Sequence, residues 1–462
     1  MEGFADMLKR SIFRQYDIRG KVGVDFDEEG AGRIAAAFAR YAGKNGCRRM
    51  LVGRDNRSSS LAIRNQVVQV LERMGWEVVD IGEVITPMFY FASRHMGIDA
   101  GIMITASHNP KEDNGFKLLL GEATIYGDEI QVIADMALEA AEDDLNSENR
   151  GSVQYVDISS VYLDAIKSRV KLGERKIKLV VDCGNGTAGF IAPTLFRELG
   201  CEVVELYCDS DPSFPHHHPD PVKVENCQDL IKVVQVEKAD LGIGFDGDGD
   251  RLGVVSAQGN IIWGDMLMIL FWREILPRYP QADCIVEVKC SQALIEEIKR
   301  LGGRPIFYKT GHSLIKAKMK ELGAVFTGEM SGHMFFADEY YGFDDALYAA
   351  ARLLRILSNT NAGLDDLLSD TPRYYATPEI RVKSSDEEKF TVVEKARQHF
   401  GKRYELIDVD GARILFPGGW GLIRASNTGP EIIVRCEGRT PEIRDQIKEE
   451  IVSYLALCGV EL

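Results

Sequence analysis

The stretch MLVGRDNRSSSLAIRNQVVQVLERMGWEVVDI, residues 50–81, predicts a strand–helix–strand unit that decides the fold class. Its apolar start, Met50–Arg54, predicts a strand, and a polar turn then leads into a helix over Leu61–Met74. Gly75 follows the last helical residue, where a glycine in the left-handed conformation commonly ends a helix. Glu77–Ile81 is predicted to be the next strand.

The same order of elements recurs twice more along the chain, with little sequence identity between the copies. Each copy is followed by a later strand that ends in a polar loop. The predicted strand, helix and strand are 177–182, 190–199 and 202–207 in the second copy, and 284–288, 293–301 and 305–308 in the third. The polar loops are 105–110, 246–251 and 328–333. Strands that alternate with helices predict largely parallel sheets covered by helices.

The last segment follows a different pattern and predicts a smaller α+β domain. Strands are expected at 378–382, 404–408, 420–424 and 431–436, and helices at 385–400 and 441–458. The polar stretches 139–152 and 358–372 are the predicted linkers. We therefore expect three similar α/β domains and a C-terminal α+β domain around a central cleft, with boundaries 1–152, 153–255, 256–367 and 368–462.

Composition and charge exclude several classes of function. The chain of 462 residues carries 55 basic and 71 acidic side chains, a net charge of −16, which disfavours nonspecific binding to nucleic acid or anionic membranes. Its nine cysteines include no C-x-x-C pair and indicate a reducing compartment. The N-terminus shows no signal-peptide pattern, and the longest apolar run, 266–272, is too short to span a bilayer. A cytoplasmic protein is expected, as a monomer or weak dimer.

Two of the polar loops carry the chemistry. Thr105-Ala-Ser107-His108-Asn-Pro puts a hydroxyl after an apolar strand, and Asp246-Gly-Asp248-Gly-Asp250-Arg251 puts three carboxylates at alternate positions after another. Three such carboxylates can turn inward on one hard cation such as Mg²⁺. An EF-hand is excluded, because a strand precedes the loop and an arginine follows it directly. A serine near a cation and an arginine predicts phosphoryl transfer, whereas the alternative for each loop is an ordinary polar turn.

Three further loops allow both a functional and a structural interpretation. Residues 328–333, GEMSGH, offer a carboxylate, a hydroxyl and an imidazole suited to sugar hydroxyls, or form a strand-to-helix turn. Residues 424–428, RASNT, would bind a phosphate or form a hairpin loop. His216-His-His218 suggests a metal site, but adjacent histidines cannot easily share one ion, so a surface loop is favoured.

Residues 184–189, GNGTAG, match the dinucleotide-binding pattern G-x-G-x-x-G between a strand and a helix, and Glu205 lies on the following strand. The corresponding turns of the other two copies lack the glycines. The turn is therefore interpreted as the helix start of the repeated unit. An NAD-dependent oxidoreductase remains the alternative from a different functional class.

The chain resembles the α-D-phosphohexomutase superfamily, and within it the bacterial phosphomannomutase/phosphoglucomutase group. The resemblance rests on motifs in family order along nearly the whole chain: YDIRG at 16–20, TASHNP at 105–110, NGFK at 114–117, DGDGDR at 246–251, KTGH at 309–312, GEMSGH at 328–333 and RASNT at 424–428. Met330 resembles the mannose/glucose subgroup, whereas glucosamine mutases more often have glutamine there. A phosphoglucosamine mutase remains the nearest alternative, and a metal-dependent sugar-phosphate binder without activity is a third.

The resemblance implies a role for each matching residue. Ser107 would be the phosphoserine and would hold Mg²⁺ together with Asp246, Asp248 and Asp250. The implied catalytic residues are Ser107, Lys117, His312, Arg19 and Arg251, with Lys117 and His312 as candidates for proton transfer. The implied substrate-binding residues are Tyr16, His108, Lys289, Glu329, Ser331, His333, Arg424, Ser426, Asn427 and Thr428. The fourth domain would have a fold like that of the TATA-box-binding protein, here without DNA binding.

The implied reaction converts a hexose 1-phosphate into a hexose 6-phosphate, with mannose or glucose as the sugar and a hexose 1,6-bisphosphate as intermediate and activator. The bisphosphate must turn around without being lost, which predicts a mobile fourth domain. Because the sugar loop would read O3 and O4, it has no strong contact with C2, where glucose and mannose differ.

Overall fold

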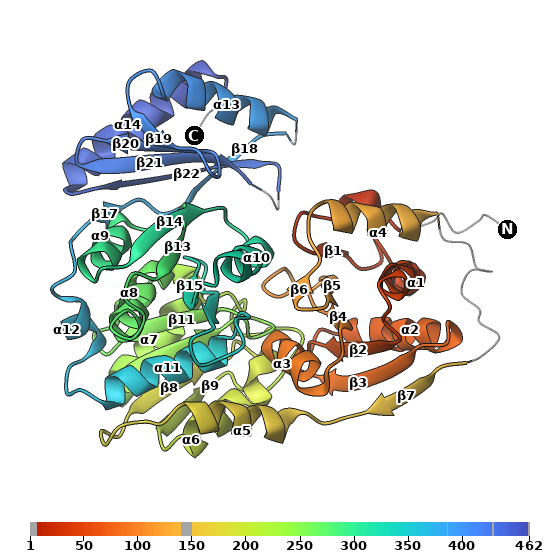
Figure 1. Cartoon of the computed structure of the whole chain (residues 1–462). Coiled ribbons are helices and arrows are strands. Elements are labelled where there is room, and N and C mark those ends of the chain that lie inside the picture. Colours follow the sequence, from red (N-terminus) through yellow and green to blue (C-terminus); the bar gives the residue numbers. More distant parts are fainter. Residues whose placement is uncertain (1–6, 140–149, 386, 427–428, 461–462) are drawn as a thin grey trace. The chain divides into compact units, whose positions relative to one another are not determined.

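The computed structural model describes residues 7–139, 150–385, 387–426 and 429–460, and the chain divides into two compact units (Figure 1). Unit 1 comprises residues 1–263 and 331–367, and unit 2 comprises residues 264–330 and 368–462. Unit 1 contains two α/β sheets. Unit 2 contains a short parallel strand pair and the C-terminal antiparallel sheet.

The first sheet of unit 1 has the strand order β1-β5-β4-β2-β3-β7, with β6 beside β5. Strands β4, β2, β3 and β7 run parallel, whereas β5 is antiparallel to both β4 and β1. The strands are β1 Ile18–Lys21, β2 Arg49–Arg54, β3 Glu77–Glu83, β4 Ala100–Ile104, β5 Asp113–Leu120, β6 Ala123–Thr124 and β7 Ser152–Tyr155. The helices are the 3-10 helix η1 Arg10–Ile12, α1 Glu28–Lys44, α2 Ser60–Arg73, α3 Thr86–Met96 and α4 Asp128–Leu138.

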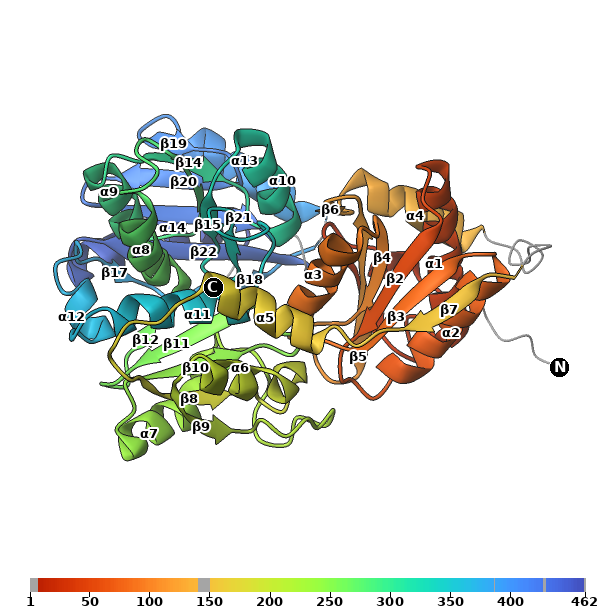
Figure 2. The ribbon, with the colours of Figure 1, turned by 60° about the horizontal axis from the view of Figure 1, so that its bottom comes forward.

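Helices cover both faces of this sheet, because successive side chains of a strand point to opposite faces. Met50 and Val52 of β2 belong to the core formed with α1, α2 and α4. On the other face, α3 packs so closely that a side chain on Gly101 would lie 2.6 Å from the ring of Phe89. Figure 2 shows α3 and α1 on opposite sides of the strands.

The second sheet of unit 1 has the order β12-β11-β10-β8-β9, with β10, β8 and β9 parallel. Its strands are β8 Lys178–Asp182, β9 Glu202–Leu206, β10 Leu241–Phe245, β11 Leu252–Ser256 and β12 Ile261–Ile262. The accompanying elements are α5 Ser159–Arg169, η3 Thr187–Phe190, α6 Ala192–Glu198, η4 Val224–Cys227, α7 Gln228–Glu237, β16 Met334–Phe336, α11 Ala346–Ser358 and α12 Leu364–Leu368. Apolar residues of α7 form a core cluster with Val180 and Val255 of the sheet.

Unit 2 begins with a third α/β element built on the parallel strands β13 Asp283–Glu287 and β14 Arg304–Tyr308. Around this pair lie α8 Gly264–Ile275, α9 Gln292–Arg300, α10 His312–Leu322 and β15 Phe326–Gly328. Ser291 caps α9 by accepting a hydrogen bond from the Ala293 amide, as expected of a serine at that position.

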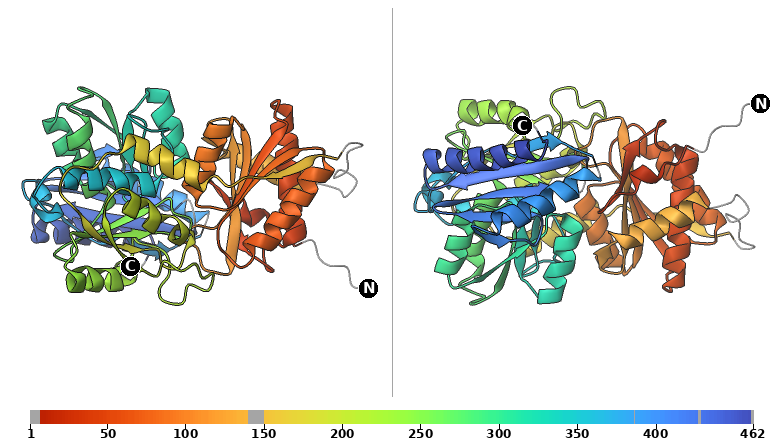
Figure 3. Two further views of the ribbon diagram at one scale, coloured as in Figure 1. Left: turned by 90° about the horizontal axis from the view of Figure 1, so that it is seen from below. Right: turned by 90° about the horizontal axis from the view of Figure 1, so that it is seen from above.

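The C-terminal sheet of unit 2 is antiparallel, with β18 beside β22 in the order β17-β22-β21-β20-β19. Its strands are β17 Tyr375–Ala376, β18 Ile380–Lys383, β19 Glu405–Ile407, β20 Ala412–Phe416, β21 Gly419–Ala425 and β22 Glu431–Gly438. Helices α13 Glu388–Phe400 and α14 Pro441–Leu457 cover one face and share an apolar core with the sheet (Figures 1 and 3). Trp420 and Leu422 on the other face pack with Val288 at the end of β13.

The predicted fold class is confirmed: helix-covered α/β sheets are followed by an α+β domain. Glycines 75, 200 and 302 follow the helices as predicted and have positive φ angles of 82°, 98° and 83°. The helix predicted over 190–199 instead forms η3 and α6, because Pro193 lacks an N–H and starts a new helix at its first turn. The helix predicted from 385 begins at Glu388, and β20 was not predicted. Among the described residues, no helix is long and apolar enough to cross a membrane.

Candidate functional site

The two polar loops with the strongest chemistry meet in unit 1. The loop after β4 carries Ser107, and the loop after β10 carries Asp246, with Ser107 Oγ donating a 2.6 Å hydrogen bond to Asp246 Oδ2. Both side chains are buried, with at most 1% of each residue exposed. A side chain on Gly247 would lie 2.4 Å from the Ser107 carbonyl oxygen, so glycine permits the close approach of the two loops.

The three predicted metal ligands lie together. One oxygen each from Asp246, Asp248 and Asp250 lies within 4.8 Å of the others, and all three residues are fully buried. Burial raises the pKa of Asp246 well above its usual range, and the charges of Asp250 and Asp248 raise it further. Oxygen ligands at this spacing suit a hard divalent cation, which would offset the repulsion between the carboxylates.

Hydrogen bonds from the described residues reach only one of the two carboxylate oxygens of Asp248. Its Oδ2 accepts from Thr86 Oγ1 at 2.6 Å, Thr105 Oγ1 at 3.2 Å and Lys117 Nζ at 3.0 Å. Its Oδ1 is buried and has no hydrogen-bond partner among the described residues. A buried carboxylate oxygen without a donor is costly unless a cation binds it. The residues therefore fit a metal ion at this position.

Lys117 of β5 lies between two of these acids, contacting Asp248 and Asp250. Burial alone would lower the pKa of Lys117, but the charges of Asp248 and Asp250 outweigh it and raise the pKa well above the usual value. Lys117 is therefore held as an ammonium ion in this arrangement, where it partly neutralises the acidic cluster.

Other predicted residues belong to the motifs at 16–20 and 105–110, and two of them contact the Ser107 loop. Arg19 donates to the Ala106 carbonyl at 3.2 Å and to Asn109 Oδ1 at 2.8 Å, and it pairs with an aspartate two residues earlier. His108 Nδ1 lies 3.0 Å from Ser107 Oγ. Burial lowers the pKa of His108 well below its usual value, and the charges of two arginines lower it further. Tyr16 is buried two residues before the start of β1.

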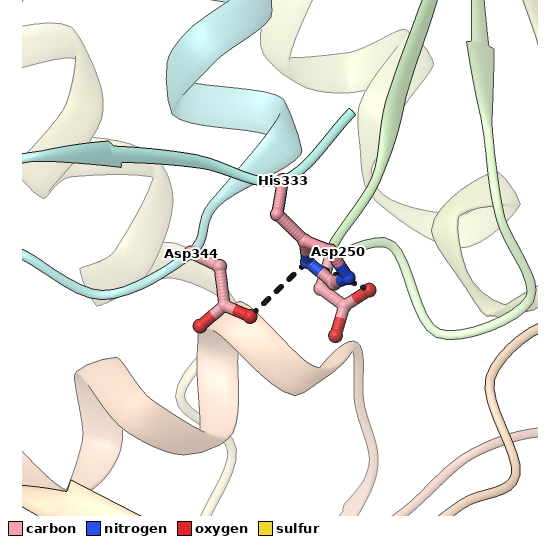
Figure 4. A group of neighbouring side chains, drawn as sticks. All are labelled: Asp250, His333 and Asp344. Carbon is pink, nitrogen blue, oxygen red and sulfur yellow. Dashed lines mark ion pairs between the residues drawn. The ribbon is translucent and has the colours of Figure 1, made fainter. Parts of the chain in front are cut away.

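Arg251, His333 and Asp344 form a chain of contacts in unit 1 (Figure 4). Arg251 Nε donates to His333 Nε2 at 3.1 Å, while His333 Nδ1 lies 3.2 Å from Asp344 Oδ2 and 3.6 Å from Asp250 Oδ1. Because a guanidinium can only donate, Nε2 must be the acceptor and Nδ1 carries the ring proton. The grouping of Asp250, His333 and Asp344 therefore orients the imidazole and does not offer a second cation site through Nδ1.

The glycine-rich turn at 184–189 packs against other loops of unit 1. Asn56 Nδ2 donates to the Asn185 carbonyl at 2.8 Å, and the Asn56 amide donates to Thr187 Oγ1 at 3.1 Å. Thr187 N donates to the Gly247 carbonyl at 3.0 Å. The turn thus joins the loop after β2 to the acidic loop. This use of its polar groups supports the interpretation as part of the repeated unit.

The histidines at 216–218 also bind within unit 1. His217 Nε2 lies 3.0 Å from Asp182 Oδ2, and the pKa of His217 is raised because its contact with Asp182 outweighs burial. His218 contacts the carbonyl of His108, next to Ser107. The three histidines bind different partners, which agrees with their interpretation as a loop rather than a metal site.

Unit 2 brings a second set of predicted residues together. Lys289 lies two residues after the end of β13. Its Nζ is 3.2 Å from Glu287 Oε1 and 3.3 Å from Glu379 Oε2. The charge of Lys289 is the main cause that lowers the pKa of Glu379 to about 2. Glu329 Oε1 accepts from the Gly311 amide at 2.7 Å, next to the start of α10 at His312.

The predicted phosphate loop follows β21 in the same unit. Arg424 is 3% exposed and its Nε donates to Asp410 Oδ2 at 3.0 Å, while its Nη2 is buried without a hydrogen-bond partner among the described residues. Ser426 Oγ accepts from the Gly429 amide at 3.2 Å. Asn427 and Thr428 lie outside the described residues. Ser331 of unit 1 is partly exposed.

Several side chains that the sequence analysis did not assign take part in these clusters. They include Arg57, Thr86, Thr105 and Asp344 in unit 1, and Glu287, Glu379 and Asp410 in unit 2. Thr105 and Arg57 lie inside polar turns that directly follow predicted strands, and this position could have suggested from the sequence that they belong to the site. The others are separated in sequence from any motif.

The fold and these clusters define a class. This is a multidomain α/β protein with a buried serine hydroxyl on a carboxylate triplet, an arrangement suited to phosphoryl transfer assisted by a metal ion.

Comparison with known proteins places the chain in a family. Four family models match consecutive parts of it: the alpha/beta/alpha domains I, II and III of phosphoglucomutase/phosphomannomutase at residues 10–143, 160–259 and 263–375, and the C-terminal domain at 379–453. The chain belongs to the phosphoglucomutase/phosphomannomutase family.

Individual relatives span nearly the whole chain. A phosphomannomutase/phosphoglucomutase of Pseudomonas aeruginosa is 45% identical over 96% of this chain and 95% of its own. A probable phosphoglucosamine mutase of Methanopyrus kandleri is 33% identical over 96% and 98%. The crystal structure of a Burkholderia thailandensis phosphoglucomutase/phosphomannomutase family protein has a TM-score of 0.92, with 40% identity over 98% and 100%. These relatives do not favour the oxidoreductase alternative.

Proposed function

We propose that the chain is a phosphohexomutase that interconverts hexose 1-phosphates and hexose 6-phosphates, with mannose and glucose as the sugars. The observation that carries the proposal is the 2.6 Å hydrogen bond between Ser107 Oγ and Asp246 Oδ2, inside a cluster that fits a divalent cation. Family membership supports the mutase class. The higher identity to a phosphomannomutase/phosphoglucomutase than to a phosphoglucosamine mutase supports the choice of sugars.

In the proposed reaction, Ser107 carries the phosphoryl group. The bond between phosphorus and Ser107 Oγ breaks as a bond to the substrate O6 forms, and a neighbouring base takes the O6 proton. The resulting 1,6-bisphosphate turns around. The bond between phosphorus and its O1 then breaks as the bond to Ser107 Oγ forms again, and O1 takes up a proton. A Mg²⁺ held by Asp246, Asp248 and Asp250 would supply positive charge beside the transferring group.

The chain's own residues would orient and neutralise this transfer. Arg251, fixed at its Nε by His333, would direct its remaining donors to the phosphoryl oxygens. Arg19 and His108 would hold the Ser107 loop and bind substrate. Lys117 and His312 remain the proposed proton-transfer residues, with Tyr16 and Lys289 as further substrate contacts.

The distal end of the substrate is assigned to other loops. We retain Glu329 and Ser331 as ligands of sugar O3 and O4. Arg424 and Ser426, with Asn427 and Thr428, would bind the phosphate that does not react. Arg424 Nη2 is buried and has no hydrogen-bond partner among the residues described, which supports an anionic ligand beside the loop after β21.

The remaining expectations stay part of the proposal. The chain would work in the cytoplasm as a monomer or weak dimer, with four domains at 1–152, 153–255, 256–367 and 368–462. Nine free cysteines support a reducing compartment. The net charge of −16 supports the absence of nucleic-acid binding.

Two experiments test the function. A coupled assay with mannose 1-phosphate, glucose 1-phosphate and glucosamine 1-phosphate should show turnover of the first two, activated by a hexose 1,6-bisphosphate. Preferred turnover of glucosamine 1-phosphate would favour the phosphoglucosamine mutase alternative. Incubation with ³²P-labelled bisphosphate should label the wild type and not Ser107→Ala; label that survives on the variant would identify another carrier.

A further inference from the structure

The loop that presents Ser107 has a backbone conformation that needs support. Ser107 has a φ angle of 51°, in the left-handed region that side chains other than glycine disfavour. Such a conformation persists only where the surroundings determine it, and it often occurs where function requires one orientation of a side chain. The residues that hold the loop therefore decide where the Ser107 hydroxyl points.

Arg57 makes more hydrogen bonds to this loop than any other residue described above. Its Nη2 donates to the carbonyl oxygens of Ser107 at 2.8 Å and Asn109 at 2.7 Å. Its Nη1 donates to those of Pro110 at 2.6 Å and Asp113 at 2.9 Å. The residue is 2% exposed, so water does not compete for these bonds.

The topology of the first sheet brings Arg57 to this loop. Strands β2 and β4 are parallel neighbours, with Arg54 opposite Ile104, so the loops that follow them start side by side. The Asp55 amide donates to the Ile104 carbonyl at 2.9 Å and ties the two loops together. The carboxylate of Asp55 then anchors Arg57, because its Oδ2 lies 3.2 Å from Arg57 Nε and its Oδ1 accepts from the Arg57 amide at 3.1 Å.

The chemistry of the side chain suits this task. A guanidinium is a rigid, planar fork with several donors, whereas a lysine ammonium is a point charge on a flexible stem. Only the fork can reach four carbonyl oxygens of one loop at once. In the described structure Arg57 bonds to the backbone of the loop and to Asp55, so it acts through the loop and not on the reacting atoms.

We propose that Arg57 is the positioning residue of the phosphoryl carrier: its guanidinium holds the 107–113 turn so that the Ser107 hydroxyl faces the carboxylate triplet. This rests on the proposed function of Ser107 as carrier. The expected signature is a loss in the transfer step with little change in substrate binding, because the loop and not the substrate is misplaced.

The test measures kcat, KM and ³²P labelling of Ser107 in Arg57→Lys and Arg57→Ala. A misplacement of about 1 Å is enough to reduce kcat about 10²-fold. We expect that loss in both variants, with KM changed less than about threefold and labelling slowed in parallel. Added guanidinium ion at tens of millimolar should restore kcat of Arg57→Ala about tenfold and leave Arg57→Lys unchanged, because the lysine fills the space.

Arg33, on helix α1 beside the same sheet, provides a matched control. It also donates to backbone carbonyls, those of Ala137 and Leu138 at 2.9 and 2.6 Å, at the end of α4. Arg33→Ala should lose stability, keep kcat within about twofold of the wild type and show no response to guanidinium. A purely structural role of Arg57 would give this same pattern.

A second variant keeps the test decisive if the Arg57 variants do not fold. Asp55→Asn retains the guanidinium but weakens its anchor, and kcat should fall about tenfold. Folded variants at either position that keep wild-type kcat would overturn the proposal. The function itself fails separately, if the wild type takes up no label on Ser107.

Discussion

The two units bury charge in opposite ways. In unit 1, Asp246, Asp248 and Asp250 outnumber the one lysine that contacts them, and Asp248 Oδ1 has no hydrogen-bond partner within the described part of the chain. In unit 2, acids contact Lys289 and the Nε of Arg424, whereas Arg424 Nη2 has no hydrogen-bond partner in the residues that the structure describes. Among the described residues, unit 1 therefore holds a buried acceptor without a donor, and unit 2 holds a buried donor without an acceptor.

Each unit thus buries a charged side chain with one atom that has no hydrogen-bond partner among the described residues. Burial of a charged group is tolerated when partners satisfy it, and each partner missing from the protein must come from elsewhere. In the proposed function, a metal ion would be the partner of the acidic cluster in unit 1, and a phosphate of the substrate would be the partner of Arg424 in unit 2.

Asp248→Asn, which removes a charge from the acidic cluster, is expected to have the largest effect. The variant should bind the cation weakly and lose about 10³-fold in kcat, because less positive charge reaches the transferring group. Removal of metal with a chelator should abolish wild-type activity, and added Mg²⁺ should restore it.

Asp240→Asn is the matched control for this change. Asp240 precedes β10, at the end of the strand opposite to the acidic loop, and pairs with Arg175. It should keep activity and metal dependence. Equal losses in the two variants would show that the acidic cluster has no special role.

Arg424→Ala tests the opposite cluster. The open Nη2 would no longer meet the distal phosphate, so KM should rise about 10- to 100-fold while kcat changes less. Steady-state kinetics in both reaction directions measure this. As a control, Arg397→Ala removes an exposed ion pair on α13 and should leave both KM and kcat unchanged. If Arg424→Ala also left KM unchanged, Arg424 would not be part of the phosphate site.

Glu379→Gln tests the ion pair between Glu379 and Lys289 through the pH dependence of stability. The pKa of Glu379 is lowered to about 2, mainly by the charge of Lys289, so the folded state holds the ionised carboxylate more favourably than the unfolded state does. The resulting stability is present above the ordinary pKa of glutamate and is lost as pH falls toward 2. Between pH 6 and pH 3 the wild type should lose about 2 kcal/mol that the variant does not lose.

Denaturant unfolding at several pH values measures the difference between the wild type and Glu379→Gln. Their free energies of unfolding should converge as the solution becomes more acidic. Parallel curves over pH 3 to 6 would mean that Glu379 is not held ionised by its cationic neighbours.

Asp344→Asn is expected to have the smallest effect. The negative charge of Asp344 lies 3.2 Å from His333 Nδ1 and favours the ring orientation in which Nε2 accepts from Arg251. An amide keeps the packing but supports this orientation less well, so kcat should fall about tenfold with KM nearly constant. His333→Gln should give a similar loss, and combining both changes should add little.

Asp345 is the natural control, because it is the adjacent buried aspartate and caps α11 instead of contacting His333. Asp345→Asn should reduce stability without the same loss of kcat. If the two variants lose kcat equally, Asp344 supports the fold and does not position Arg251.

Local patterns were sufficient for much of the molecule. The glycine after each repeated helix predicted where helices 60–73 and 292–300 end, and alternating strands and helices predicted the sheet class. Spacing within DGDGDR predicted that its carboxylates would share one site, because residues two apart in a short loop cannot separate far. The break at Pro193 and the strand at 412–416 were missed.

Sequence patterns alone were enough to predict the repeated α/β units, the Ser107 and acidic loops, and the family to which they belong. The folded structure alone shows which distant side chains complete these loops: Arg57 on the Ser107 turn, Thr86 on Asp248, and His333 on Arg251. The reason is physical. Periodicity and turn chemistry are local, whereas a contact between residues 50 or more positions apart depends on which strands become neighbours in the sheet.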